Sequence, residues 1–126
     1  MKIGFICAEY PPGPHGGIGT VTQVLARALV SHGHEVRVAG VYDKSCAAPD
    51  YEEDQGVKVW RHRMSQFRFD WLVERWRLWR IAARWARRQE VDAIEVPDWQ
   101  GFGAYWPRLR VPVVVRVHGS VSFVAA

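Results

Sequence analysis

The chain begins with an apolar run, a loop rich in proline and glycine, and a helical pattern, and this order constrains the fold most. Residues 2–8 are nearly continuously apolar, as in a strand of a parallel sheet that is buried on both faces. Apolar residues then recur at a spacing of three and four from Val21 to Leu29, and Thr20 is a candidate N-cap. We therefore expect a strand, an active-site loop over residues 9–20, and a helix whose positive N-terminus binds an anion.

The loop at residues 9–20 differs from two common phosphate-binding loops. It lacks the Gly-Lys-Ser/Thr of a P-loop, and its glycines do not follow the strand directly as they do in the dinucleotide fingerprint. Prolines restrict its first half, and Gly16, Gly17 and Gly19 follow. Two interpretations stay open: an ordinary surface turn, or an anion site where glycine allows close backbone approach or a left-handed conformation.

Composition indicates one globular domain with an anionic partner. The chain has 126 residues, of which 48% are apolar and 24% charged, and this excludes a disordered protein. A formal charge of +4 favours a phosphate-bearing ligand, an acidic membrane surface or nucleic acid. Cys7 and Cys46 are far apart and lack a cluster of metal ligands, so we expect neither a zinc site nor a disulfide. The short N-terminal apolar run is unlike a signal peptide, and we expect a cytoplasmic protein.

Strand and helix patterns alternate along the rest of the chain. Four further segments have the pattern of strands: residues 35–41, 57–61, 91–96 and 111–117. Residues 70–90 form a helical pattern, residues 44–55 a polar loop, and residues 101–106 a short helix. We predict an α/β fold, a three-layer Rossmann-like domain with a parallel sheet of about five strands in the order 3-2-1-4-5. Ligands gather at the C-terminal ends of such strands.

The helical pattern at residues 70–90 combines four tryptophans with six arginines. Against three acidic residues, the six arginines leave +3 of the chain's formal +4 on this segment. One stripe is expected to face the core and contains Leu72, Trp76, Trp79, Ala83 and Ala86. A second stripe contains Arg77, Arg80, Arg84 and Arg87. The arginine stripe is either a solvated basic face or a membrane-binding surface, because arginine with tryptophan is typical of helices that lie on anionic membranes. No nucleic-acid-binding motif accompanies it.

The order and spacing of three motifs resemble a known enzyme family. These motifs are Glu-Tyr-Pro-Pro at residues 9–12, Gly-Gly-Ile-Gly at residues 16–19 and Gly-His-Glu-Val-Arg-Val at residues 33–38. They look like the opening of the retaining glycosyltransferases of the GT-B fold, usually called family 4, which include glycogen and sucrose synthases. The resemblance runs from Lys2 to Ser120. It implies transfer of a sugar from a nucleotide-sugar donor, with retention at the anomeric carbon, in a cleft between two Rossmann-like domains.

The resemblance also implies roles for particular residues. Gly16 and Gly17 match the double glycine beside the diphosphate of the donor. His118, directly after the last predicted strand, matches a catalytic histidine that approaches the donor sugar and the reacting centre. Asp98 and Trp99 match a loop that faces the acceptor. The implied partners are a nucleotide-sugar and a sugar or lipid acceptor, and we expect no cofactor, no metal ion and no nucleic acid.

Residues 1–126 match only part of the family's N-terminal, acceptor-side domain, and the basic donor-phosphate residues and paired glutamates of its second domain have no counterpart here. We therefore expect a truncated, acceptor-side fragment that is inactive alone. Two alternatives stay open. One is a non-catalytic Rossmann-like module that binds an acidic membrane or partner, peripherally at the inner membrane face, through the arginine and tryptophan helix. The other is a dinucleotide-dependent oxidoreductase, with Asp43 as its ribose-binding carboxylate.

Overall fold

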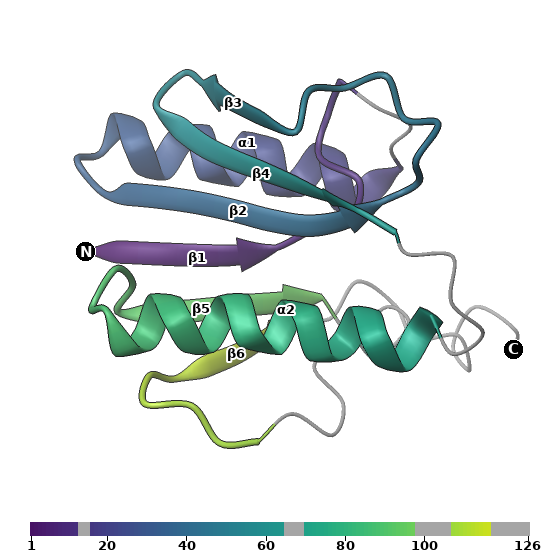
Figure 1. Cartoon of the computed structure of the whole chain (residues 1–126). Coiled ribbons are helices and arrows are strands. Elements are labelled where there is room, and N and C mark those ends of the chain that lie inside the picture. Colours follow the sequence, from purple (N-terminus) through teal and green to yellow (C-terminus); the bar gives the residue numbers. More distant parts are fainter. Residues whose placement is uncertain (13–15, 65–69, 98–106, 117–126) are drawn as a thin grey trace, which may run out of the picture.

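The computed structural model describes residues 1–12, 16–64, 70–97 and 107–116 (Figure 1). Its elements are, in chain order, β1 (Lys2–Ile6), α1 (Gly17–Ser31), β2 (Glu35–Tyr42), β3 (Tyr51–Asp54), β4 (Val57–Arg63), α2 (Asp70–Arg87), β5 (Ala93–Pro97) and β6 (Val113–Arg116). The predicted short helix at residues 101–106 lies outside the described residues. Among the described residues, the helices are too short or too polar to span a bilayer.

The strands form a single mixed sheet in the order β3-β4-β2-β1-β5-β6. The five strands β4, β2, β1, β5 and β6 are parallel and have the predicted order 3-2-1-4-5, which is confirmed. The sixth strand, β3, pairs antiparallel with β4 inside the segment that was predicted to be a loop. That prediction was wrong because β3 is a short edge strand with an acidic sequence and no apolar alternation.

The turn between β3 and β4 did carry a sequence signal for this hairpin. Gln55 and Gly56 both have positive φ, at 50° and 88°, as both central residues of a type I′ turn require. A two-residue turn ending in glycine is typical of antiparallel hairpins. Gly33 lies directly after the helical pattern, where a glycine in the left-handed conformation is expected to end a helix. It ends α1 with φ of 90°, and the N–H groups of Gly33 and His34 donate to the carbonyls of Val30 and Leu29.

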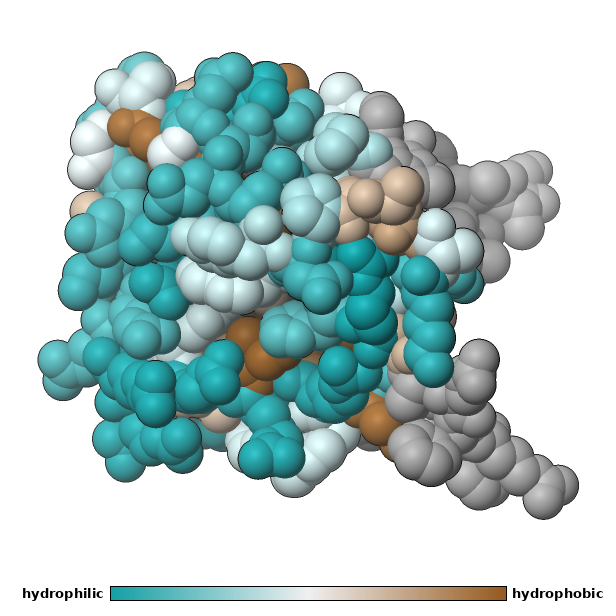
Figure 2. Space-filling view, turned by 45° about the horizontal axis from the view of Figure 1, so that its top comes forward, coloured by the Kyte–Doolittle hydropathy of each residue, from teal (hydrophilic) through white to brown (hydrophobic). Residues whose placement is uncertain are grey.

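A helix covers each face of the sheet, which confirms the three-layer architecture (Figure 1). Successive residues of β1 divide between the two cores, because side chains alternate along a strand. Phe5 and Cys7 belong to the core on the α1 side, whereas Ile6 packs with Leu78 and Trp85 on the α2 side. The surface in Figure 2 is mostly hydrophilic, with apolar residues in small separate patches.

The core face of α2 differs from the predicted stripe. Its buried apolar residues are Leu78, Ile81, Ala82, Trp85 and Ala86, and of these Ala86 belongs to the predicted stripe. Leu72 is 49% exposed and Trp76 is 52% exposed, so the prediction that they face the core was wrong. The ring of Trp76 instead stacks on Trp79 with 4.8 Å between centroids. The helix holds more apolar residues than one face accommodates, so two stripes satisfied the periodicity, and packing against the sheet selected the one with Leu78, Ile81 and Trp85.

Candidate functional site

The loop that follows β1 is held by a tyrosine from the neighbouring strand. The buried hydroxyl of Tyr42, on β2, accepts a hydrogen bond from the N–H of Tyr10 at 2.8 Å. The same hydroxyl donates to the carbonyl of Cys7 at 3.0 Å. One side chain thus fixes two points of the chain as it leaves the sheet. Burial raises the pKa of Tyr42, so its hydroxyl keeps the proton that this arrangement needs.

A buried arginine holds the next part of the loop. The side chain of Arg61, on β4, has no exposed surface. One terminal nitrogen donates to the carbonyls of Tyr10 and Pro11 at 3.1 and 2.9 Å and to Glu52 at 2.6 Å. The other terminal nitrogen donates to the carbonyl of Pro49 at 3.1 Å. These four acceptors compensate for taking a charge out of water. Arg61 therefore ties the loop after β1 to the β3–β4 hairpin.

Sequence reasoning missed Arg61, although its pattern held a signal. Alternation along β4 places Val57, Val59 and Arg61 on the same face of the sheet, and the two valines are completely buried. An arginine at an inward position of a strand needs several acceptors there, because a buried charge is otherwise too costly. The sequence does not reveal these acceptors, because two of them are carbonyls of the loop after β1 and meet Arg61 only in the folded chain.

A second polar cluster links the loop to α1. The hydroxyl of Tyr10 donates to Asp54 at 2.6 Å, and Arg27 on α1 donates to both oxygens of this carboxylate at 2.9 and 2.7 Å. The hydrogen bonds from Arg27 are the main cause that lowers the pKa of Asp54, and those from Tyr10 act in the same direction. Burial, and then Asp54, raise the pKa of Tyr10. At neutral pH the cluster therefore consists of a phenol, a guanidinium and a carboxylate.

The double glycine lies at the N-terminus of α1, as the sequence predicts. Gly16 is the N-cap and Gly17 the first helical residue. Thr20 is therefore not the cap that was expected: it lies in the first turn, where its hydroxyl donates to the carbonyl of Gly16 at 3.1 Å. A carboxylate oxygen of Glu9 accepts the N–H of Gly19 at 2.9 Å. The protein thus places its own anion at this helix end, as the helix dipole favours.

The structure gives no steric reason for glycine at position 17. A Cβ built there meets nothing within 4 Å, and Gly17 has helical rather than left-handed backbone. A Cβ at Gly16 would lie 3.6 Å from Glu9, an ordinary contact. The expectation that these glycines allow a left-handed conformation is therefore wrong. Of the two reasons given for an anion site, close approach of a ligand to the backbone remains. The N–H groups of Gly17 and Ile18 precede the first residue with an intrahelical acceptor and point out of the helix end.

The other residues predicted at the sheet edge lie outside the described residues. These are Asp98 and Trp99, which follow β5, and His118, which follows β6. The strands that lead to them are parallel to β1, so β1, β5 and β6 all end at the same edge of the sheet. The roles of these three residues stay predictions.

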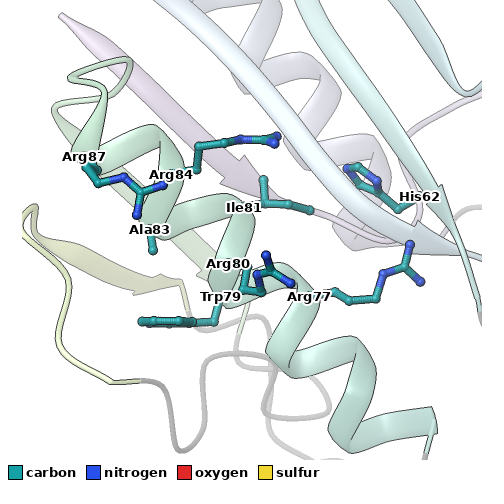
Figure 3. A pocket seen from close by; sticks show the side chains of 8 residues that line it. All are labelled: His62, Arg77, Trp79, Arg80, Ile81, Ala83, Arg84 and Arg87. Carbon is teal, nitrogen blue, oxygen red and sulfur yellow. The ribbon is translucent and has the colours of Figure 1, made fainter.

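All four arginines of the predicted stripe line one hollow on α2. The hollow has a volume of about 350 Å³ and is lined by His62, Arg77, Trp79, Arg80, Ile81, Ala83, Arg84 and Arg87 (Figure 3). Sequence reasoning also missed His62, which lies just beyond the strand predicted at residues 57–61 and belongs to β4. Burial and the neighbouring Arg77 and Arg84 lower its pKa. The imidazole is therefore neutral at pH 7.

The cysteines have no catalytic features. Both are free, Cys7 is completely buried, and burial raises the pKa of its thiol to about 11. A thiol of this kind is a poor nucleophile. In the part of the chain that the structure describes, histidine, cysteine and carboxylate side chains do not gather in groups of three that could hold a metal ion.

Comparison with known proteins identifies relatives. A family described as "glycosyl transferase 4-like domain" matches residues 16–125. An uncharacterized glycosyltransferase of Methanocaldococcus jannaschii is 45% identical over 64 residues. The aligned segment is 50% of this chain but only 15% of that relative.

Proposed function

Because the chain belongs to the glycosyl transferase 4-like domain family, we propose that it contributes the acceptor-side domain of a retaining glycosyltransferase. The enzyme would transfer a sugar from a nucleotide-sugar to a sugar or lipid acceptor. The observation that carries the proposal is the double glycine at the N-terminus of α1, next to the end of β1. Helix N-termini bind phosphate through free N–H groups.

In this proposal the diphosphate binds at the N–H groups of Gly17 and Ile18. When the sugar leaves, negative charge develops on the diphosphate, and N–H donors that are already oriented stabilise it without reorganising. Glu9 already accepts the N–H of Gly19, so it holds the first turn in place but also repels an anion. The diphosphate would therefore bind on the side of the helix end away from Glu9. This assignment needs no metal ion, and the absence of a cofactor stays a prediction.

Gly17→Ala tests the proposal, because the structure has room for the added methyl group. The folded domain should be unchanged or about 0.5 kcal/mol more stable, since alanine favours a helix more than glycine does. Turnover of nucleotide-sugars by the full-length enzyme should fall by about a hundredfold or more, because the methyl group would displace the diphosphate from the N–H groups of Gly17 and Ile18. Val21→Ala, on an exposed position of the same helix, is the control. Normal turnover by Gly17→Ala would show that the loop is only a structural turn.

The catalytic role of His118 and the acceptor-facing role of Asp98 and Trp99 are part of the same proposal. His118→Ala should lower turnover more mildly than a substitution at Gly17, because positioning is lost only in part. Substitutions of Asp98 and Trp99 should raise the KM for the acceptor and leave the KM for the donor unchanged. Equal changes in both constants would argue against a place on the acceptor side.

A second proposed function is peripheral contact with an anionic membrane at the inner membrane face. The supporting observation is that Leu72 and Trp76 are about half exposed on the helix that carries the arginines. Amphipathic helices bind such membranes through apolar insertion together with basic residues. Trp76→Ser should therefore reduce co-sedimentation with anionic vesicles at low salt. Val24→Ser, which changes an exposed apolar residue of α1, is the control. Equal binding by both variants would remove the membrane function.

A further inference from the structure

The arginines of α2 surround a concave site rather than a flat surface. Arg77, Arg80 and Arg84 lie around Ile81, and His62 faces them from β4 (Figure 3). The hollow lies on the α2 side of the sheet, whereas the double glycine belongs to α1 on the opposite side. It is thus separate from the proposed diphosphate site.

One arginine of the hollow is held in place by the protein. Arg77 donates to the carbonyl of Arg63 at 2.8 Å and pairs with Glu74 at 3.1 Å, so its guanidinium bridges α2 and β4. A positioned guanidinium costs less conformational entropy when it binds a ligand. Its pairing with Glu74 also leaves Arg77 with less unbalanced charge than the other arginines.

The other three arginines of the hollow are not neutralised by ion pairs with neighbouring carboxylates among the described residues. Within the described ranges, the ion pairs include none with Arg80, Arg84 or Arg87. Asp50 and Glu74 raise the pKa of His62, and the effect of each is smaller than that of Arg77 or Arg84. Glu90, Arg37 and Arg88 line an adjoining hollow with His62, and Glu90 is paired with Arg37. Asp50 and Glu74 are themselves paired with Arg63 and Arg77. The lining of the hollow contains no carboxylate, so its potential is strongly positive.

We propose that the hollow between α2 and β4 binds a phosphate group, held by Arg77, Arg80 and Arg84, with His62 as an additional donor. Guanidinium groups bind phosphate oxygens with paired hydrogen bonds, and several of them together match a doubly charged phosphate better than a singly charged carboxylate. Ile81, Ala83 and Trp79 add apolar surface for the group that carries the phosphate. Phosphomonoesters and the headgroup of phosphatidic acid share this chemistry.

The titration of His62 reports directly on occupancy. In the free protein, burial and then Arg77 and Arg84 disfavour protonation of the imidazole and lower its pKa. A bound phosphate screens these charges and favours the protonated ring, so the pKa of His62 should rise by about one unit. By linkage, phosphate should then bind about tenfold more tightly when His62 is protonated. A solvated basic face with loosely associated ions would not produce a saturable shift.

The test is an NMR titration of the His62 ring in the 126-residue chain with inorganic phosphate at constant ionic strength. Saturable binding and the rise in pKa are expected. Arg80→Gln and Arg84→Gln should each weaken binding about tenfold, whereas Arg108→Gln, which removes an exposed charge outside the hollow, should not. Thermal midpoints show that the variants are folded. Absence of saturation, or equal weakening by Arg108→Gln, would overturn the proposal.

Vesicles then identify the source of the phosphate. Binding to phosphatidylcholine vesicles that contain phosphatidic acid, competed by inorganic phosphate and lost in Arg84→Gln, would assign the site to a lipid headgroup. Saturable binding of inorganic phosphate without vesicle binding would assign it to a soluble phosphomonoester. Both results support the site and are independent of turnover, so failure here and failure of the proposed transferase function can be told apart.

Discussion

Replacing Arg61 with methionine should destabilise the domain strongly, because it removes the group that connects the loop after β1 to the β3–β4 hairpin. Methionine keeps an unbranched apolar stem but donates no hydrogen bonds. The carbonyls of Tyr10, Pro11 and Pro49 lose their donor, and Glu52 loses its counter-ion. Removing one partner of a buried ion pair costs about 3–5 kcal/mol. Glu52 keeps 25% of its side-chain surface exposed and can be rehydrated, so we expect the lower end, about 3 kcal/mol.

Urea denaturation followed by circular dichroism measures this loss, and the thermal midpoint should fall by roughly 10 °C for a domain of this size. Amide exchange adds a local test: the N–H of Tyr10 should exchange faster in Arg61→Met. Arg116→Met is the matched control, because Arg116 pairs with Glu95 while its own side chain is 43% exposed. A loss below about 1 kcal/mol in Arg61→Met, or an equal loss in the control, would refute the claim that the buried guanidinium holds the loop.

Two further predictions concern stability. Gly40→Ala should destabilise the domain by at least about 3 kcal/mol in urea denaturation, because a Cβ there would overlap the backbone carbonyl of Cys7; a smaller loss would mean that β1 and β2 separate easily. The lowered pKa of Asp54, caused first by Arg27, means that the unfolded state binds the proton more readily. Its contribution to stability is thus present above the unfolded pKa of about 4 and is lost as the pH falls through the lower folded pKa. Asp54→Asn should flatten the pH dependence of the unfolding free energy in that range, and an unchanged profile would contradict the assignment.

The sequence by itself determined the features that depend on neighbours along the chain. The apolar pattern of residues 2–8 and 35–41 predicts buried parallel strands, because both faces of such strands are covered. Gly33 predicts the end of α1, since glycine takes a left-handed conformation without strain. The crossover rule then gives the order of the five parallel strands. The sequence also predicts the double glycine at the start of α1, because it lies directly before the helical pattern.

Tertiary structure decided the features that depend on contacts between distant segments. Periodicity allowed two apolar stripes on α2, and contact with the sheet selected the one with Leu78 and Trp85. Arg61 sits at an inward position of its strand, but its acceptors come from a loop about 50 residues earlier and from β3. The position of His62 among the arginines of α2 likewise requires β4 to lie beside that helix. Hydrogen bonds and charges act through space, so no local pattern reveals which partner a polar side chain will meet.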